Sequence, residues 1–325
     1  MAQIYVISPS SALRDRVKFK RGVARLKKLG HTVELDEAAL THYQRFASDD
    51  AVRIACLERA AACGADVVMI SRGGYGLTRS LPDLPYKAIA KSVDKGCKWM
   101  GYSDFTALQA PLWAKTGAVT WMGPAVSDDF GFVDPATDAP DDIMEACFDD
   151  LMQGVGEGTG WRMSAALPST STHKKIATND EMALTLPQFS VKNAVLWGGN
   201  LNVLCSLVGT PYLPKIKGGV LVLEDVGEHP YRVERQLSQL LHAGVLSSQK
   251  AIILGQFSAY KLVKGYDRGF NLKSVIERVQ SKLPKTPILD NMPFGHVPTK
   301  VCLPWGAKVQ LDVQGRDALV FWGDV

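Results

Sequence analysis

The sequence predicts an α/β protein with two domains, a doubly wound parallel sheet followed by an α+β or partly barrel-like domain of mixed strands. Short apolar strands alternate with helical stretches through the first half of the chain, which is typical of a parallel sheet covered by helices. That alternation is lost in the middle of the chain. The length of 325 residues also exceeds the roughly 250–300 residues at which a single hydrophobic core stops growing. Two domains are therefore expected.

The elements of the first domain follow from apolar spacing and from glycines that end helices. One helix face is marked by apolar residues at i, i+4, i+8 and i+11, namely Val52, Cys56, Ala60 and Cys63. Glycine follows two of the helical stretches, at Gly30 and Gly64, where a left-handed end is expected. The same reasoning predicts strands at 3–8, 31–35, 66–71, 98–101 and 118–122, and helices at 13–29, 52–63, 86–93 and 105–116.

The second half of the chain shows a different pattern. Residues 219–223 form a continuous apolar run, and residues 308–321 alternate in part between apolar and polar, as antiparallel strands do. A further strand is predicted at 251–255, and helices at 233–245 and 270–283, the last opened by Asn271. Between the two halves lies a glycine-rich and then Ser/Thr-rich stretch, which we interpret as a linker that can include a lid. The predicted boundaries are 1–151, 152–191 and 192–325.

Composition excludes several functional classes. Hydrophobic residues make up 46% and charged residues 22% of the chain, as in ordinary globular proteins. The net charge of +4 is small and scattered, so no nucleic-acid partner is expected. Residues 193–214 carry no charge, but they contain Gly198, Asn200 and Pro211 among other breakers. A membrane span is therefore not expected.

The six cysteines form no C-x-x-C pair and no zinc-like spacing with histidine. No metal and no cofactor is expected. Most of the cysteines lie in apolar segments, as small buried thiols do. The N-terminus has no secretory pattern, because its first basic residue, Arg14, follows the apolar run rather than preceding it. These features predict a protein of the reducing cytoplasm.

Ligands of open α/β sheets bind beyond the carboxyl ends of the strands, so the loops after the predicted strands hold the candidate site. Residues 72–76 read Arg-Gly-Gly-Tyr-Gly, whose glycines let backbone N–H groups approach an oxyanion or a phosphate. Such a loop is also often only a tight turn. The loop after the fifth predicted strand, at 123–124, is uninformative by itself.

Residues 101–105, Gly-Tyr-Ser-Asp-Phe, form the second informative loop. Ser103 lies at the tip of a strand-to-helix turn, which resembles a nucleophile elbow. The usual second glycine is missing, because Phe105 takes its place. The alternative is that Ser103 or Asp104 caps the following helix. The turn alone does not decide between them.

A serine nucleophile needs a base and a group that orients the base. Of the six histidines, His229 and His296 remain as candidates once those in a strand, in polar stretches and in an amphipathic helix are set aside. His296 follows Pro-Phe-Gly in a tight, turn-rich segment, which is a good position for a base. Glu224 ends a buried apolar run, where a carboxylate needs a partner or a task. Asp225 and Glu228 are close rivals, and any of the three acids can instead pair with a nearby arginine.

The motifs together resemble the LD-carboxypeptidases of peptidoglycan recycling, a family that also includes self-immunity peptidases against microcin C. The resemblance covers nearly the whole chain and rests on six segments in order: 72–76, 101–106, 198–201, 209–212, 223–235 and 293–296. It implies an N-terminal flavodoxin-like domain, a C-terminal domain of mixed strands and an active site in the groove between them. It also implies a catalytic triad of Ser103, His296 and Glu224, and a homodimer.

The implied reaction releases D-alanine from a cytoplasmic murein tetrapeptide through an acyl-enzyme. The oxyanion would be held by the N–H of Asp104 and, as the favoured second donor, the N–H of Gly74. The substrate would be bound by Arg72, Asn200 and Trp197. The middle segment is longer than in the simplest members of the family that the chain resembles, which puts the substrate range in question. The alternatives are hydrolysis of an aminoacyl adenylate analogue, with Trp161 as an aromatic platform, and a non-enzymatic protein that binds cell-wall peptides.

Overall fold

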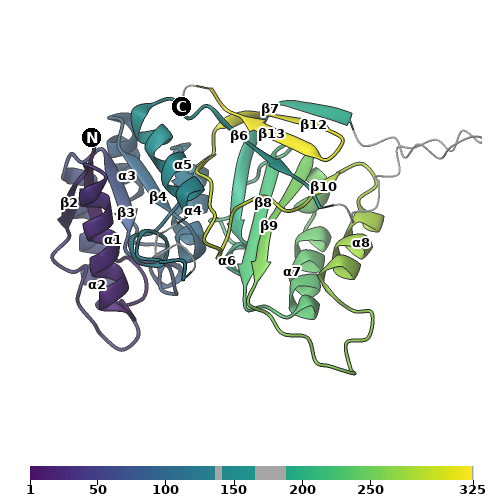
Figure 1. Ribbon diagram of the computed structural model, residues 1–325, viewed down its shortest axis with the longest axis horizontal. Coiled ribbons are helices and arrows are strands. Elements are labelled where there is room, and N and C mark those ends of the chain that lie inside the picture. The colour runs from purple at the N-terminus through teal and green to yellow at the C-terminus, as the bar shows by residue number, and fades with distance from the viewer. Residues whose placement is uncertain (136–140, 165–187, 324) are drawn as a thin grey trace, which may run out of the picture. The chain divides into compact units, whose positions relative to one another are not determined.

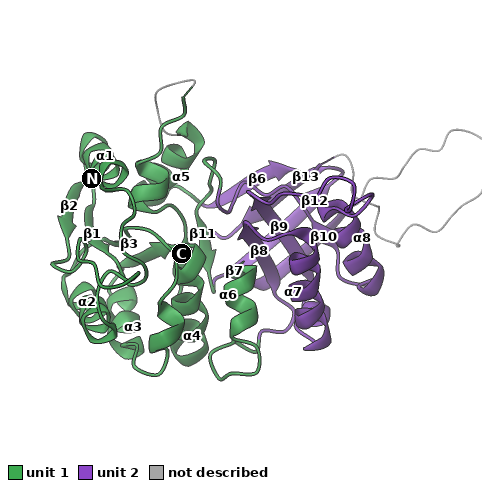
Figure 2. Cartoon of the chain, turned by 90° about the horizontal axis from the view of Figure 1, so that it is seen from below, with its two compact units in different colours: residues 1–156, 198–215, 297–306 green, residues 157–197, 216–296, 307–325 purple. Residues whose placement is uncertain are grey.

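The computed structural model describes residues 1–135, 141–164, 188–323 and 325 (Figure 1). These residues divide into two compact units, coloured separately in Figure 2. Unit 1 comprises residues 1–156, 198–215 and 297–306, and unit 2 comprises residues 157–197, 216–296 and 307–325. Each unit contains a sheet of its own, as the predicted α/β class with a second domain of mixed strands requires. Neither unit is continuous in sequence, because two short late segments pack with unit 1.

The sheet of unit 1 has the strand order β11-β5-β4-β3-β1-β2. Its five N-terminal strands are parallel, and their order 2-1-3-4-5 is that of a flavodoxin-like fold. The implied doubly wound sheet is thus confirmed. An added edge strand pairs antiparallel with β5. The strands are β1 (Gln3–Ile7), β2 (Thr32–Leu35), β3 (Val67–Ile70), β4 (Lys98–Gly101), β5 (Thr120–Met122) and β11 (Leu303–Trp305).

Helices cover both faces of this sheet. Figure 2 shows α1 and α5 on one side and α2, α3 and α4 on the other. Local signals begin several of them: Asp15, for example, accepts hydrogen bonds from the N–H groups of Val17 and Lys18 at the start of α1. The helices of unit 1 are α1 (Arg16–Lys28), α2 (Asp50–Ala62), α3 (Tyr86–Asp94), α4 (Thr106–Thr116), α5 (Asp142–Gln153) and α6 (Leu201–Ser206).

Unit 2 has a seven-stranded sheet with the order β10-β9-β8-β7-β12-β13-β6. The pairs β10–β9 and β9–β8 are parallel, and β7, β12, β13 and β6 pair antiparallel in turn. Two helices pack against each other beside it, α7 (Pro230–His242) and α8 (Leu272–Lys282). The strands are β6 (Gly158–Arg162), β7 (Gln188–Asn200), β8 (Val220–Val226), β9 (Ala251–Ser258), β10 (Ile288–Leu289), β12 (Lys308–Gln314) and β13 (Asp317–Phe321).

The stretch expected to be a linker or lid, 152–191, falls in large part on residues 165–187, which lie outside the described residues. Its described parts contain the strand β6 and the start of β7, neither of which the sequence pattern indicated. Within the described ranges, no helix is long and apolar enough to cross a membrane.

Candidate active site

The turn after β4 holds Ser103 in a strained conformation. Its φ angle is +62°, in the left-handed region that side chains other than glycine seldom adopt. The two helical segments that follow are capped by Tyr102 and Phe105, and neither makes a side-chain capping bond. The capping alternative for Ser103 and Asp104 is therefore wrong. The geometry is instead that of a strained strand-to-helix turn that presents a hydroxyl, as in a nucleophile elbow.

Two glycines make room for this turn. A Cβ atom at Gly101 would lie 2.8 Å from Ile70 Cδ1 and 2.9 Å from the ring of Phe105. A Cβ atom at Gly73 would lie 2.7 Å from the Cβ and 2.8 Å from the Oγ of Ser103. The glycine-rich loop after β3 thus packs directly on the serine. Phe105, in place of the usual second elbow glycine, fills the space over Gly101.

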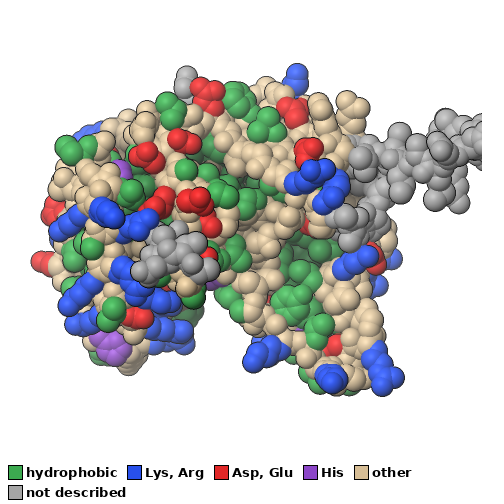
Figure 3. Space-filling model, in the orientation of Figure 1, with side chains coloured by type: hydrophobic (Ala, Val, Ile, Leu, Met, Phe, Trp, Pro, Cys, Tyr) green, Lys and Arg blue, Asp and Glu red, His purple; other side chains and the backbone are tan. Residues whose placement is uncertain are grey.

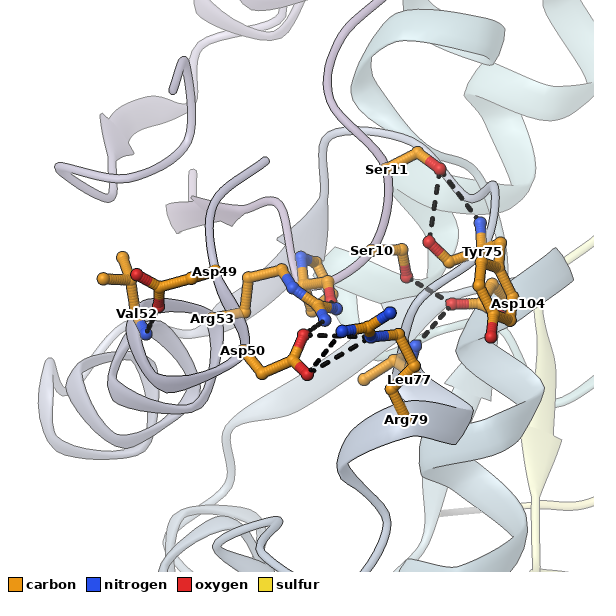
Figure 4. Close-up of polar contacts among 11 residues, drawn as sticks. Ser10, Ser11, Asp49, Asp50, Val52, Arg53, Tyr75, Leu77, Arg79 and Asp104 are labelled. Atoms are coloured by element: carbon orange, nitrogen blue, oxygen red, sulfur yellow. Dashed lines mark hydrogen bonds and ion pairs between the residues drawn. The ribbon is translucent and has the colours of Figure 1, made fainter. Parts of the chain in front are cut away.

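The side chain of Asp104 joins the turn to two other loops (Figure 4). It is 1% exposed, and its Oδ2 accepts a hydrogen bond of 2.6 Å from Ser10 Oγ and one of 3.0 Å from the N–H of Leu77. Burial raises the pKa of Asp104, although these hydrogen bonds oppose the shift. The sequence suggested an oxyanion role for the N–H of Asp104 and a capping role for its side chain, but it gave no sign of these two contacts. The partner Ser10 is 94 positions away.

The glycine-rich loop is held near its C-terminal end (Figure 4). Ser11 Oγ accepts from the N–H of Tyr75 at 3.0 Å and donates to its carbonyl at 3.3 Å. Beyond the loop, Asp50 accepts from Arg79 Nη2 at 3.0 Å and also from Arg53. Gly74 has a φ angle of +115°, which a residue with a side chain rarely adopts. These contacts and the φ angle of Gly74 constrain the backbone of the loop. Gly74 directly follows Gly73, the residue that packs on Ser103.

A buried ion pair supports the residue before Ser103. Lys300 is 0% exposed, and its Nζ lies 2.6 Å from Asp129 Oδ1. The same ammonium lies 3.9 Å from the centre of the Tyr102 ring, a cation–π contact. Burial raises the pKa of Asp129, while Lys300 opposes that shift. The members of this pair are 171 positions apart, so no local pattern in the sequence indicates it.

In unit 2, Glu224 and His296 form a hydrogen-bonded pair. His296 Nδ1 lies 2.7 Å from Glu224 Oε2, and the carboxylate is 0% exposed. Because a carboxylate only accepts hydrogen bonds, Nδ1 carries the proton and Nε2 is the basic nitrogen of the neutral ring. The imidazole side chain is 21% exposed. A buried carboxylate that fixes the tautomer of a partly exposed histidine is the arrangement of a catalytic base.

The backbone around the pair explains its geometry. The pairing of β8 with β9 shifts register between Leu223 and Asp225, so Glu224 lies at a β-bulge, a feature that redirects a side chain. Gly295 has a φ angle of +128°, and a Cβ atom there would lie 3.1 Å from Glu224 Cβ. Ser258 Oγ donates to the carbonyl of His296 at 3.1 Å.

The rival residues are used elsewhere in unit 2. His229 Nε2 lies 3.0 Å from Asp267 Oδ2, and its Nδ1 accepts from the N–H of Tyr231 at the start of α7. Asp225 Oδ1 accepts from the N–H of the next residue, and Glu228 lies 3.6 Å from an arginine one helical turn on. The structure therefore brings Glu224, rather than either neighbouring acid, to His296.

The expected substrate-binding residues have mixed placements. Arg72 is partly exposed at the start of the glycine-rich loop of unit 1. Asn200 Oδ1 accepts from the N–H of Val203 and so caps α6. Trp197 is 1% exposed, and its indole N–H donates to Gln249 at 3.0 Å. The placements of Asn200 and Trp197 give no support to contact with a substrate. Trp161 is likewise 8% exposed.

Comparison with known proteins places both halves of the chain in one family. The sequence profile of the LD-carboxypeptidase N-terminal domain matches residues 4–123, and that of the C-terminal domain matches residues 193–311. The chain belongs to the LD-carboxypeptidase family. Ser103 lies within the first matched segment, and Glu224 and His296 lie within the second.

Individual relatives agree with this assignment. A muramoyltetrapeptide carboxypeptidase from Oxalobacter formigenes is 33% identical in sequence to this chain, and the match covers 99% of each chain. Its crystal structure superposes on the present structure with a TM-score of 0.81. A Bacillus subtilis protein named "probable murein peptide carboxypeptidase" is 27% identical to this chain, and the match covers 97% of this chain and 90% of the Bacillus protein. The microcin C7 self-immunity protein of Escherichia coli is 27% identical over 77% and 72% of the two chains.

Proposed function

We propose that this protein is a serine-type LD-carboxypeptidase that releases the terminal D-alanine from murein tetrapeptides during peptidoglycan recycling in the cytoplasm. Three features support the proposal: membership of the family, the strained turn at Ser103 and the Glu224–His296 pair. The name of the Oxalobacter relative supports this choice of substrate.

In the proposed mechanism, Ser103 attacks the carbonyl carbon of the bond between the diamino acid and D-alanine. Nε2 of His296 removes the hydroxyl proton and then donates it to the departing amine. Glu224 keeps the ring in the productive tautomer and stabilises its charged form. Water next attacks the acyl-enzyme, with His296 again as the base, and this step regenerates the Ser103 hydroxyl.

The negative charge that develops on the carbonyl oxygen needs hydrogen-bond donors. We assign this role to the N–H of Asp104, which follows the nucleophile as in other elbows, and to the N–H of Gly74. Each such donor contributes about 3 kcal/mol to the stabilisation of the transition state. Arg72, at the start of the same loop, is assigned to a carboxylate of the substrate. The substrate roles of Asn200 and Trp197 stay predictions.

The 2.7 Å contact between His296 Nδ1 and the fully buried Glu224 carries the proposal. A buried carboxylate is unfavourable unless it is paired, and a purely structural role would not need a partly exposed imidazole as its partner. The contact leaves Nε2 as the only ring nitrogen that can accept a proton. That is the state in which histidine acts as a general base at neutral pH.

The decisive experiment is release of D-alanine from purified tetrapeptide, followed by mass spectrometry. The Ser103→Ala and His296→Ala variants are assayed beside the wild type, and His229→Ala serves as a matched control from the same unit. We expect release by the wild type and by the control, and loss of at least about 10⁴-fold in kcat in the other two. Wild-type protein that binds tetrapeptide without turnover would instead establish a binding protein.

Hydrolysis of an aminoacyl adenylate analogue is the competing activity, because a microcin C7 self-immunity protein is among the relatives. The expected aromatic platform for adenine does not support it. The indole N–H of Trp161 donates to the carbonyl of Asp290 at 2.8 Å, and the ring is buried in unit 2. If tetrapeptide is not cleaved but an aminoacyl sulfamoyl adenosine is, this competing activity replaces the one proposed here.

A further inference from the structure

A pocket in unit 1 gathers positive charge from three separate segments. Its volume is about 330 Å³, and its lining includes Arg14, His42, Arg45 and Arg72. Its remaining lining residues, all within the described part of the chain, are Ser11 and two apolar residues, so no acid is among the residues that line it. Figure 3 shows one face of the molecule, on which Lys and Arg side chains gather on the lower part of unit 1. A concave site with convergent guanidinium groups is suited to an anion.

Arg72 is the most buried of the three arginines that line this pocket. Its side chain is 12% exposed, its Nη1 donates to the carbonyl of Ala12 at 3.3 Å, and its Nε lies 3.9 Å from Asp128 Oδ2. Burial lowers the pKa of Arg72, and the nearby charges of Arg14 and Arg45 lower it further, against the opposing effect of Asp128. The guanidinium is therefore only weakly compensated by the protein, and a bound anion would relieve the repulsion among the three cations.

The backbone that carries these cations is held in place before any ligand arrives. The N–H of Ala12 donates to the carbonyl of Arg45 at 3.0 Å, which ties the loop after β1 to the loop before α2. Gln44 has a φ angle of +54° in the turn that leads to Arg45, a strained conformation typical of functional loops. The guanidinium of Arg45 lies 5.6 Å from the centre of the Tyr75 ring.

The pocket is also close to the proposed nucleophile. Arg72 directly precedes Gly73, whose Cα approaches Ser103 so closely that a Cβ atom would lie 2.7 Å from the serine Cβ. A Cβ atom at Gly74, the next residue, would lie 3.2 Å from Arg72 Nη1, so the guanidinium lies against the same loop. We propose that Arg14, His42 and Arg45 form, with Arg72, a subsite that binds a carboxylate of the peptide substrate. This inference rests on the proposed function and extends it by naming the group that the subsite recognises.

A murein tetrapeptide whose diamino acid has no free carboxyl group offers that carboxylate from two sources, the C-terminus of the terminal D-alanine and the free α-carboxyl of the glutamyl residue. Three substrates separate them: the free tetrapeptide, its C-terminal amide and a tetrapeptide whose glutamyl α-carboxyl is an amide. The variant is Arg14→Gln/Arg45→Gln, because both side chains are exposed and neither is assigned to the chemical step. The control is Arg21→Gln/Lys28→Gln, which removes the same charge from exposed positions of α1.

We expect Arg14→Gln/Arg45→Gln to raise KM for the free tetrapeptide ten- to a hundredfold, with kcat within threefold of wild type, and the control to change neither. The increase in KM should be absent for one of the two amidated substrates. The group that is amidated in that substrate is the carboxylate that the subsite binds. A rise of the same size for all three substrates would overturn the proposal, because it would reflect general electrostatics. Unchanged KM for the free tetrapeptide would overturn it as well.

Binding measurements separate a failure of this inference from a failure of the proposed function. Titration calorimetry with Ser103→Ala protein gives the tetrapeptide Kd without turnover. If wild type does not release D-alanine but the Arg14→Gln/Arg45→Gln exchange still weakens binding at least tenfold in this background, the subsite stands and the proposed function falls. If the exchange leaves Kd unchanged, or the tetrapeptide does not bind at all, the subsite falls.

Discussion

The surroundings of Ser103 in unit 1 and of His296 in unit 2 hold their side chains by different means. Ser103 is fixed through its backbone, by a strained φ angle and by loops that a buried carboxylate ties together. His296 is held by its side chain, whose Nδ1 lies 2.7 Å from Glu224, and by its carbonyl, which accepts from Ser258 Oγ. The Ser103 turn is supported by contacts among several loops, whereas the tautomer and the charge of the imidazole depend directly on the Glu224 carboxylate. Substitutions in unit 2 are therefore expected to have the larger effect on catalysis.

The largest effect is expected for Glu224→Gln. The amide has nearly the same shape, but it neither stabilises the imidazolium nor enforces the Nδ1–H tautomer. A fall in kcat of about 10⁴-fold is expected, as for the acid of other serine triads, with little change in the unfolding temperature. D-alanine release measures the rate. Glu228→Gln is the matched control, since Glu228 only faces Arg232 at 3.6 Å. A Glu224→Gln enzyme with a tenth of the wild-type rate would refute the comparison.

A smaller effect is expected for Asp104→Ala in unit 1. The substitution leaves Ser10 Oγ and the N–H of Leu77 without their acceptor inside a buried site. We expect the unfolding free energy to fall by about 1–3 kcal/mol and kcat to fall by about 10²-fold, because the oxyanion donors lose their alignment. Urea denaturation and D-alanine release measure the two effects. The exposed Asp83→Ala is the control.

Wild-type activity in Asp104→Ala would mean that the strained turn holds its shape without the carboxylate. The packing of Gly73 on Ser103 and of Phe105 on Gly101 would then be part of what supports the turn. Loss of activity as large as that of Glu224→Gln would be equally informative, because it would make the two regions alike in depending on a single buried acid.

Much of the fold could be predicted because its signals are local. The strand at Lys98–Gly101 and the helix opened by Asn271 follow from apolar runs, glycines and a capping residue within a few positions. Ser103 and Glu224 could be singled out because each lies at the end of a strand. His296 could be singled out from the turn before it. In each case the informative neighbours are adjacent in sequence.

What could not be predicted depends on distant partners. Strand β11 pairs with β5 across about 180 residues, and a three-residue strand has no pattern of its own. The carboxylate of Asp104 and the Lys300–Asp129 pair are likewise defined by residues far away in the chain. The burial of Trp197 could not be predicted either, because an aromatic residue before two glycines looks the same in a core and in a groove. In a sequence, a positive φ angle is indicated mainly by glycine, so the positive φ of Ser103 could not be predicted from the residue type.

The smallest effect on rate, and the sharpest test of the Asp104 environment, is expected for Asp104→Asn. The amide oxygen can still accept from Ser10 and Leu77, so kcat should stay within tenfold of wild type. Burial raises the pKa of Asp104 in the folded protein, whereas the pKa of this carboxyl in the unfolded chain is about 3.9. The stability that this carboxyl contributes is therefore present below the unfolded pKa and lost as pH rises through the folded one.

Asparagine does not titrate, so the unfolding free energy of Asp104→Asn minus that of wild type should increase as pH rises from about 3 to 7. Urea denaturation across this range measures the difference, with Asp83→Asn as the control for loss of one charge. The opposite slope would show that the hydrogen bonds from Ser10 and Leu77 outweigh burial and lower the pKa of Asp104. The carboxylate would then stabilise the Ser103 turn as an anion, much as Glu224 is proposed to stabilise His296.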